Sequence, residues 1–401
     1  MSKFSIEEAA QRSGVDSDYV HGLVELGILT PGKDGAFSPG DVRRVRLVHS
    51  LERAGIPLEG MAAAVGNGEL SFAFMDLPVF DRFSGLSGTT FRELGAKTGI
   101  PVELLMLVRE AIGFAQPTPD DQVRDDELLI VPAIELQLAR GLRTTTIERW
   151  LQVYGDSLRR MAETESDWWR AEVELPLIES GIGEGEVLNE ASRWGAQFAP
   201  LHDQAIGAIF HGHEEHAWLK NMILNVENAL EEAGLRSKLL RVPAIAFLDI
   251  TGYTRLTEER GDEAAAELAA QLSRVVQRTS RQHGGKPVKW LGDGVMFYFS
   301  EPAPGVLAAL EMVDHVVGAD LPPAHVGLHA GPVVPQDGDY FGRTVNTAAR
   351  IAEYARPGEV VVTQEVVDAA EGYSLTFSRI GPVELKGVAE IPTLYAARRR
   401  E

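Results

Sequence analysis

The stretch AIAFLDITGYTRL, residues 244–256, decides the fold of the C-terminal part of this 401-residue chain. Its first five residues are apolar and lead to a single carboxylate, Asp249. A run of this length with these flanks favours a buried strand over a helix. Thr251 and Gly252 then predict a turn, and a helical pattern begins at about Thr254. Hard cations bind carboxylate oxygens, and helix starts favour anions, so this strand end suits a metal and a phosphate.

Taken alone, a strand-end aspartate is more often a helix cap or a turn former than a metal ligand. A second segment, KPVKWLGDGVMFYF at residues 286–299, makes the metal-ligand interpretation stronger. It predicts a β-hairpin whose tip is Gly292, Asp293 and Gly294, so it again places one aspartate between two strands. The alternative is an ordinary Asp-Gly hairpin turn.

A third segment, DGDYFGRTVNTAAR at residues 337–350, predicts a turn followed by a helix. Asn346 and Arg350 are four residues apart and therefore lie on one face of that helix. The alternative is an exposed polar face, which we favour less because the rest of the helix is mostly small and apolar.

Several motifs, in matching order and spacing, resemble the catalytic domain of class III nucleotidyl cyclases: FLDITGYT, KWLGDGVMF, VGLHAGPV, DYFGRTVNTAARI and VELKGVAEIPTLY. The resemblance covers the chain from about Arg241 to the C-terminus. Predicted strands and helices alternate over this part, so we expect an α/β sandwich of the ferredoxin-like type with a mostly antiparallel sheet.

The resemblance implies conversion of ATP to 3′,5′-cyclic AMP and pyrophosphate with two divalent cations, Mg²⁺ or Mn²⁺, in each site. The implied metal ligands are Asp249, Asp293 and the carbonyl oxygen of Ile250. The implied phosphate contacts are backbone N–H groups of Thr251, Gly252, Tyr253 and Thr254. Metal coordination lowers the pKa of the attacking ribose hydroxyl, and a second cation neutralises the phosphates.

The resemblance also implies the roles of five further residues. Lys289 matches the position that contacts a ring nitrogen of adenine, and Asp339 matches its partner, which accepts from the exocyclic amine. Asn346 matches the residue that orients the ribose. Arg350 matches the residue that stabilises charge at the pentacoordinate phosphorus, a role suited to a rigid guanidinium. Lys386 matches a lysine that binds the triphosphate.

In this family one subunit supplies the metal aspartates and the other supplies the base-reading residues, the asparagine and the arginine. We therefore expect a homodimer with two equivalent sites. One alternative is a guanylate cyclase, which Lys289 and Asp339 disfavour, because a guanine reader has a carboxylate in place of Lys289. Another is a DNA-binding regulator whose cyclase-like domain only senses nucleotide.

Residues 1–75 resemble the winged helix-turn-helix head of MerR-type regulators. The expected recognition helix carries Asp16, Asp18, His21 and Glu25, where base and phosphate contacts require Arg, Lys, Asn or Gln. We therefore regard DNA binding as the weaker interpretation and favour a protein-interaction module. Residues from Phe91 repeat the pattern weakly, since FRELGAKTGIPVELLMLVREAIGF parallels FSIEEAAQRSGVDSDYVHGLVELGIL. This predicts a degenerate duplication.

Residues 76–217 are predicted to form a helical regulatory domain, similar to that of soluble actinobacterial pH-responsive adenylate cyclases. The resemblance implies control of the catalytic half by protons or by a fatty-acid-like effector. Residues 218–240 predict a linker helix. Leu219, Met222, Ile223, Val226 and Leu230 approach the a/d spacing of a dimeric coiled coil, and a simple packed linker helix is the alternative. The fold class is therefore multi-domain, with an all-α N-terminal half and an α/β catalytic half at residues 241–401.

Four of the ten histidines, His202, His211, His213 and His216, fall in one short segment. Because histidine titrates near physiological pH, a proton sensor is one hypothesis. A solvated helix face is the alternative that we weigh slightly higher, and a metal site is third.

The composition of the chain excludes or disfavours several kinds of site and of binding partner. The chain has no cysteine, which excludes disulfides and thiolate metal sites. Its formal net charge of −21 opposes non-specific binding to nucleic acid and to anionic membranes. No apolar run is long enough to span a bilayer and no signal peptide is evident, so we expect a cytoplasmic protein.

Overall fold

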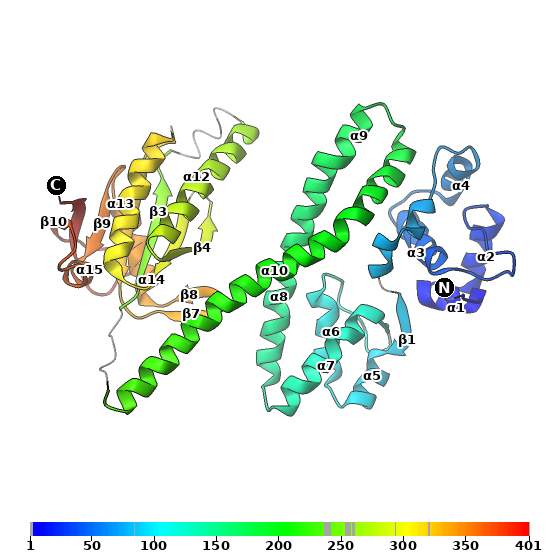
Figure 1. Cartoon of the computed structure of the whole chain (residues 1–401), viewed down its shortest axis with the longest axis horizontal. Coiled ribbons are helices and arrows are strands. Elements are labelled where there is room, and N and C mark those ends of the chain that lie inside the picture. Colours follow the sequence, from blue (N-terminus) through cyan, green and yellow to red (C-terminus); the bar gives the residue numbers. More distant parts are fainter. Residues whose placement is uncertain are drawn as a thin grey trace. The chain divides into compact units, whose positions relative to one another are not determined.

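The computed structural model describes residues 3–83, 85–235, 242–252, 258, 261–292, 294–319 and 321–400 (Figure 1). It divides into two compact units, Met1–Ile223 and Leu224–Glu401, which are described separately below. None of the helices in the described part of the chain combines the length and the hydrophobicity that a bilayer span requires.

The first unit opens with a helical domain that has its own apolar core. Its helices are α1 (Ile6–Ser13), α2 (Ser17–Glu25), α3 (Pro39–Arg53) and α4 (Leu58–Gly66), followed by the short 3₁₀ helices η1 (Ala73–Asp76) and η2 (Pro78–Arg82). The only pairing that could represent a wing among the described residues is a single bridge between Phe4 and Phe37. The winged-helix interpretation therefore stays a prediction.

A second helical domain follows, with a separate core. Its elements are β1 (Leu86–Thr90), α5 (Phe91–Thr98), α6 (Val102–Ala111), β2 (Gln122–Arg124), α7 (Asp125–Ala139) and α8 (Thr144–Trp169). The order of its helices repeats that of the first domain. In both domains the first helix begins with a capping box, at Ser5 and Thr90, and ends at a left-handed glycine, Gly14 and Gly99. The recurring caps support the duplication that the sequence predicts.

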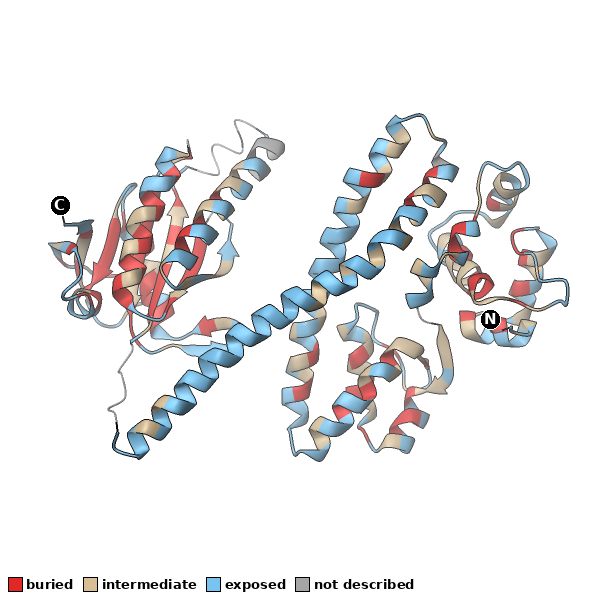
Figure 2. Cartoon of the chain, in the orientation of Figure 1, coloured by how far each residue is buried: buried red, intermediate tan, exposed pale blue. Residues whose placement is uncertain are grey.

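After α8 the chain forms the π-helical turn η3 (Arg170–Glu174), α9 (Leu175–Glu179) and α10 (Glu184–Glu232). Helix α10 runs through residue 218 without a break, so residues 218–232 of the predicted linker helix are the end of a longer helix. Residues 236–240 of that prediction lie outside the described residues. Most of α10 is exposed in the single chain (Figure 2).

The second unit is built on a seven-stranded mixed sheet with strand order β10-β11-β9-β6-β3-β5-β4. Its elements are β3 (Ala244–Ile250), α12 (Asp262–Gln282), β4 (Gly285–Leu291), β5 (Gly294–Phe299), α13 (Pro302–Gly318), β6 (Ala324–Ala330), β7 (Val334–Gln336), β8 (Asp339–Phe341), α14 (Arg343–Tyr354), β9 (Val360–Thr363), α15 (Gln364–Ala369), β10 (Leu375–Pro382) and β11 (Thr393–Arg399).

Strands β3 to β6 and helices α12 and α13 follow the β-α-β-β-α-β order of ferredoxin-like folds. All adjacent strands pair antiparallel except β6 and β9, which confirms the expected mostly antiparallel sheet. Strand β3 lies inside the sheet between β5 and β6, which explains why its sequence is almost continuously apolar. Helices α12 and α13 pack on one face, where the largest core lies (Figure 2).

The other face of the sheet carries α14 and the β7–β8 hairpin. Val345 and Ala348 of α14 pack with Ile245 and Met296 of the sheet, and Tyr340 of β8 joins the same cluster. This second face therefore brings together strand β3, the hairpin β4–β5 and the segment 337–350, which are the three segments that the sequence singled out.

Candidate active site

Asp249 lies at the end of β3, as predicted, and its side chain is about half exposed at 47%. The register pairs Asp249 with His325 of β6, whose Nε2 lies 3.7 Å from the Asp249 Oδ2. His325 is buried, and its Nδ1 lies 3.3 Å from the hydroxyl oxygen of Thr251. The carboxylate at the strand end thus has a fixed neighbour on one side and solvent on the other.

The start of β5 lies beside this strand end. Leu248 pairs with Val295, and a Cβ built on Gly294 would lie 3.5 Å from the Asp249 Oδ1. Gly252, in the turn after β3, has φ +79, which is the left-handed conformation that favours glycine. Gly294 therefore lies beside the carboxylate, and Gly252 allows the turn that follows the strand.

Three predicted site residues, Tyr253, Thr254 and Asp293, lie outside the described residues. Within the described ranges, no group of three or more His, Cys, Asp or Glu side chains is gathered in a way that could hold a metal ion. The predicted metal ligands therefore remain a prediction. The chemistry of Asp249 and of the Ile250 carbonyl fits a hard divalent cation, since both offer oxygen atoms.

The two predicted base-reading residues are in direct contact. Lys289 of β4 and Asp339 of β8 are fifty positions apart in the sequence, and the Lys289 Nζ lies 2.5 Å from the Asp339 Oδ2. Both side chains are partly exposed, at 36% and 25%. The pair presents an ammonium donor and a carboxylate acceptor side by side at an accessible position.

Asn346 and Arg350 lie on α14, as predicted, and the buried Thr344 fixes the start of this helix by donating to the Pro332 carbonyl oxygen at 2.7 Å. Asn346 is exposed. The Arg350 guanidinium forms an ion pair with Glu353, one turn further along, and this hydrogen bond raises the pKa of Arg350. Glu353 was not predicted from the sequence.

Lys386 lies in the exposed loop between β10 and β11. Its neighbour Leu385 is buried in a cluster with Ile351 of α14. The loop is thereby attached to the helix that carries Asn346 and Arg350.

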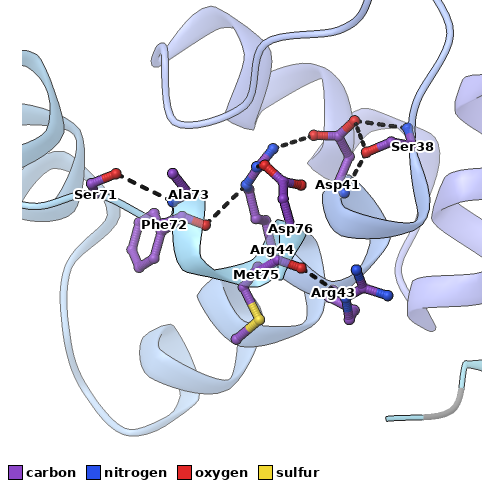
Figure 3. Close-up of polar contacts among 9 residues, drawn as sticks. All are labelled: Ser38, Asp41, Arg43, Arg44, Ser71, Phe72, Ala73, Met75 and Asp76. Atoms are coloured by element: carbon purple, nitrogen blue, oxygen red, sulfur yellow. Dashed lines mark hydrogen bonds and ion pairs between the residues drawn. The ribbon is translucent and has the colours of Figure 1, made fainter. Parts of the chain in front are cut away.

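Two arginines of α3, Arg43 and Arg44, make internal contacts (Figure 3). Arg44 forms ion pairs with Asp41, at 2.5 Å, and with Asp76, and its Nε donates to the Phe72 carbonyl oxygen at 3.1 Å. The Arg43 Nε donates to the Met75 carbonyl oxygen at 3.0 Å. These side chains tie α3 to the η1 segment, which opposes a role in DNA contact.

The histidine segment lies inside α10. His202 Nδ1 lies 3.1 Å from the Glu165 Oε1 of α8, whereas His211, His213 and His216 are exposed. Residues two apart on a helix do not face one another, which removes the argument for a metal site at His211 and His213. His202 borders an apolar groove of about 990 Å³ between the two helices, with Leu158, Met161, Trp168 and Ile206 among its lining residues.

His325 is a neighbour of Asp249 that was not predicted from the sequence. Its signal was a polar residue inside the apolar strand segment AHVGLHA. A strand pattern alone does not state which neighbouring strand such a residue faces, because that depends on the register.

Comparison with known proteins identifies two families. Residues 241–397 match the family described as adenylate and guanylate cyclase catalytic domain, and residues 32–217 match the adenylate cyclase regulatory domain. A pH-sensitive adenylate cyclase of Mycobacterium tuberculosis is 28% identical over 323 residues, which cover 77% of each chain.

Other relatives match shorter stretches. An uncharacterized protein of M. tuberculosis strain H37Rv is 31% identical over 240 residues, covering 59% of this chain and 60% of that protein. The crystal structure of an adenylyl cyclase from P. aeruginosa is similar over 40% of this chain and 97% of its own, with 22% identity and a TM-score of 0.36. By these two family matches, residues 241–397 are similar to adenylate and guanylate cyclase catalytic domains, and residues 32–217 are similar to adenylate cyclase regulatory domains.

Proposed function

We propose that this chain is an adenylate cyclase that converts ATP to 3′,5′-cyclic AMP and pyrophosphate at two sites of a homodimer. The observation that carries the choice of ATP is the contact between Lys289 and Asp339. A lysine only donates hydrogen bonds and an ionised carboxylate only accepts them. Adenine presents an acceptor, N1, beside a donor, the exocyclic amine, and the pair offers the complementary groups.

The other proposed roles follow the chemistry of the site. Lys386 and the backbone N–H groups after β3 bind the phosphates, and Asn346 orients the ribose. Arg350 stabilises the charge that develops at the α-phosphorus, since a planar guanidinium can donate two hydrogen bonds in fixed geometry. Asp249, the Ile250 carbonyl and Asp293 hold the two divalent cations. When bound, the cations lower the pKa of the ribose 3′-hydroxyl and offset phosphate charge.

The proposed homodimer is supported by apolar surface that the single chain leaves open. Trp290, Leu291 and Phe341 around the base-reading pair are 41%, 50% and 47% exposed. Leu219, Met222, Ile223 and Val226 of α10 are each about half exposed, at 49%, 48%, 51% and 56%. Exposed apolar surface of this kind marks protein interfaces. A second copy of the chain is the proposed partner, because each proposed site takes residues from two subunits.

Turnover by the full chain tests the proposal. Purified protein is incubated with ATP or with GTP and Mn²⁺, and cyclic nucleotide is measured. We expect cyclic AMP from ATP and at most weak formation of cyclic GMP from GTP. Asp293→Ala is expected to abolish turnover and to leave the dimer intact, whereas the control Asp368→Ala, at an exposed position on α15, retains turnover. Near wild-type activity of Asp293→Ala would contradict the metal assignment.

The helical half is proposed to control this activity in response to protons or to a fatty-acid-like molecule. The relative from M. tuberculosis carries pH sensitivity in its name, and the contact between His202 and Glu165 borders the apolar groove between α8 and α10. Replacing His202, His211, His213 and His216 together with glutamine is expected to flatten the dependence of activity on pH. An unchanged profile would exclude these histidines as the sensor.

A further inference from the structure

Two tyrosines from distant parts of the catalytic domain stack beside the base-reading pair. Tyr298 of β5 and Tyr340 of β8 have ring centroids 4.4 Å apart and planes inclined by 10°. The Lys286 ammonium lies 5.1 Å from the Tyr340 centroid and 5.9 Å from that of Tyr298. Tyr340 is 6% exposed, and burial lowers the pKa of Lys286 and raises that of both tyrosines. Stacking and cation–π contacts of this geometry fix rings relative to one another.

The stack is connected to Asp339 through the backbone. The Tyr340 backbone N–H donates to the Asp339 Oδ1 at 2.7 Å, and the Lys289 ammonium donates to the Oδ2 at 2.5 Å. Both oxygens of the carboxylate therefore have donors, and one donor belongs to Tyr340. A displacement of Tyr340 moves Asp339 with it.

Lys289 is connected to the same unit by an irregularity of β4. Lys286 pairs with Tyr298, and Lys289 pairs with Met296, so three steps along β4 match two steps along β5. Such a β-bulge inserts one residue and re-aims the side chains that follow it. Without it, Lys286 and Lys289 would point to opposite faces of the sheet. The bulge therefore places Lys289 on the face that carries the tyrosine stack.

Lys289 and Asp339 select adenine through their order in space as well as through their chemical groups. Guanine presents an acceptor, O6, beside a donor, N1–H, which is the adenine pattern in reversed order. A lysine and a carboxylate that could exchange positions would satisfy either base. Discrimination against guanine then requires that the ammonium and the carboxylate stay in a fixed order in space.

We propose that Tyr298, Tyr340 and Lys286 are positioning residues that hold Lys289 and Asp339 in the order that fits adenine and excludes guanine. This inference rests on the proposed function of the same site. None of the three residues is assigned a contact with the base. They act on Asp339 through the backbone N–H of Tyr340 and on Lys289 through strand β4.

The test compares ATP with GTP for the full-length protein. We measure kcat and KM for both nucleotides with Mn²⁺, and equilibrium binding of both by calorimetry. In Tyr298→Leu, which removes the stacked ring, we expect the preference for ATP to fall by about tenfold or more, mainly through a higher KM for ATP and improved use of GTP. Tyr298→Phe keeps the ring and is expected to keep the wild-type ratio.

Tyr395→Leu is the matched control. Tyr395 is a partly buried tyrosine of β11 that packs against the core on the other face of the sheet. A purely structural effect lowers kcat/KM for ATP and for GTP by the same factor. That result in Tyr298→Leu would overturn the inference. If Tyr298→Leu does not fold, Lys286→Met is tested in its place. We expect it to lower the preference for ATP over GTP by less than Tyr298→Leu would. An unchanged preference would overturn the inference.

The two proposals fail in distinguishable ways. A wild-type protein that forms no cyclic nucleotide from ATP refutes the proposed function. The binding ratio of ATP to GTP in wild type and Tyr298→Leu still tests the positioning role in that case, because it does not depend on turnover. Equal ratios in the two proteins would refute that role.

Discussion

Gly327, in the middle of β6, lies directly against the backbone of Ala352 in α14. A Cβ built on Gly327 would lie 2.1 Å from the Ala352 nitrogen and 2.6 Å from its Cα. Only glycine allows the helix to approach the sheet this closely. The contact sets the distance between the sheet and the helix that carries Asn346 and Arg350.

Gly327→Ala is expected to displace α14. The free energy of unfolding should fall by about 1–3 kcal/mol or more, as overpacking of a core typically does. Cyclic AMP formation should fall by roughly 100-fold, because a shift of about 1 Å in a catalytic group has this effect. Denaturant unfolding measures the loss of stability, and steady-state kinetics measure the loss of cyclic AMP formation. Gly318→Ala is the control, since a Cβ there meets nothing within 4 Å. Equal behaviour of the two variants would contradict the prediction.

Arg350 and Glu353 provide a test of the proposed charge stabilisation. In the single chain the guanidinium binds Glu353, so it must exchange this partner for phosphate during turnover. Arg350→Lys is expected to lower kcat by about 100-fold with a small change in KM, because an ammonium cannot replace the planar fork. Glu353→Gln removes the competitor, and kcat should stay within about threefold of wild type. A loss of kcat in Glu353→Gln as large as that in Arg350→Lys would show that Glu353 is required.

The sequence predicted the parts of the catalytic fold that depend on local pattern. The apolar run before Asp249 formed the inner strand, and the segments before and after the predicted turn formed the paired strands β4 and β5. The shared role of Lys289 and Asp339 in reading the base, in contrast, was implied by family resemblance. Neither periodicity nor turn chemistry brings together residues from β4 and β8.

Other features depended on long-range packing and could not be predicted. The bulge in β4 follows from the pairing with β5, and the neighbour of Asp249 follows from the register of β6. The α3 segment with Arg43, Arg44 and Arg46 offered no sign that Arg43 and Arg44 bind a segment about thirty residues away. Charge patterns show which residues attract one another, but the chain path decides which of them meet.

His329 of β6 predicts how stability depends on pH. Burial lowers the pKa of His329 from its usual 6.5, and the nearby Glu365 opposes this shift only in part. A lowered folded-state pKa means that the stabilisation is complete above pH 6.5 and is lost as the pH falls through the folded value. His329→Gln does not titrate and can still bind the Thr363 hydroxyl, which lies 2.8 Å from the His329 Nδ1.

Thermal unfolding of wild type and His329→Gln between pH 8 and pH 5 measures this contribution. The melting temperature of wild type should fall relative to that of the variant below about pH 6.5. A difference between the two proteins that is constant over this range would show that His329 does not titrate in the folded domain.

Arg44 separates the structural role of α3 from a role in DNA binding. Its side chain is 15% exposed and that of its partner Asp41 only 7%, so Arg44→Ala leaves a buried carboxylate without its cation (Figure 3). Breaking such a pair costs about 3 kcal/mol. We therefore expect a large loss of stability of the first helical domain in Arg44→Ala, measured by denaturant unfolding. We also expect that the wild-type protein does not shift duplex DNA at 150 mM salt.

The control is Arg53→Ala, at an exposed position of the same helix, which should leave stability within about 0.5 kcal/mol of wild type. A wild-type DNA shift that both substitutions weaken would instead support the DNA-binding interpretation, because phosphate contacts contribute to affinity through each exposed cation.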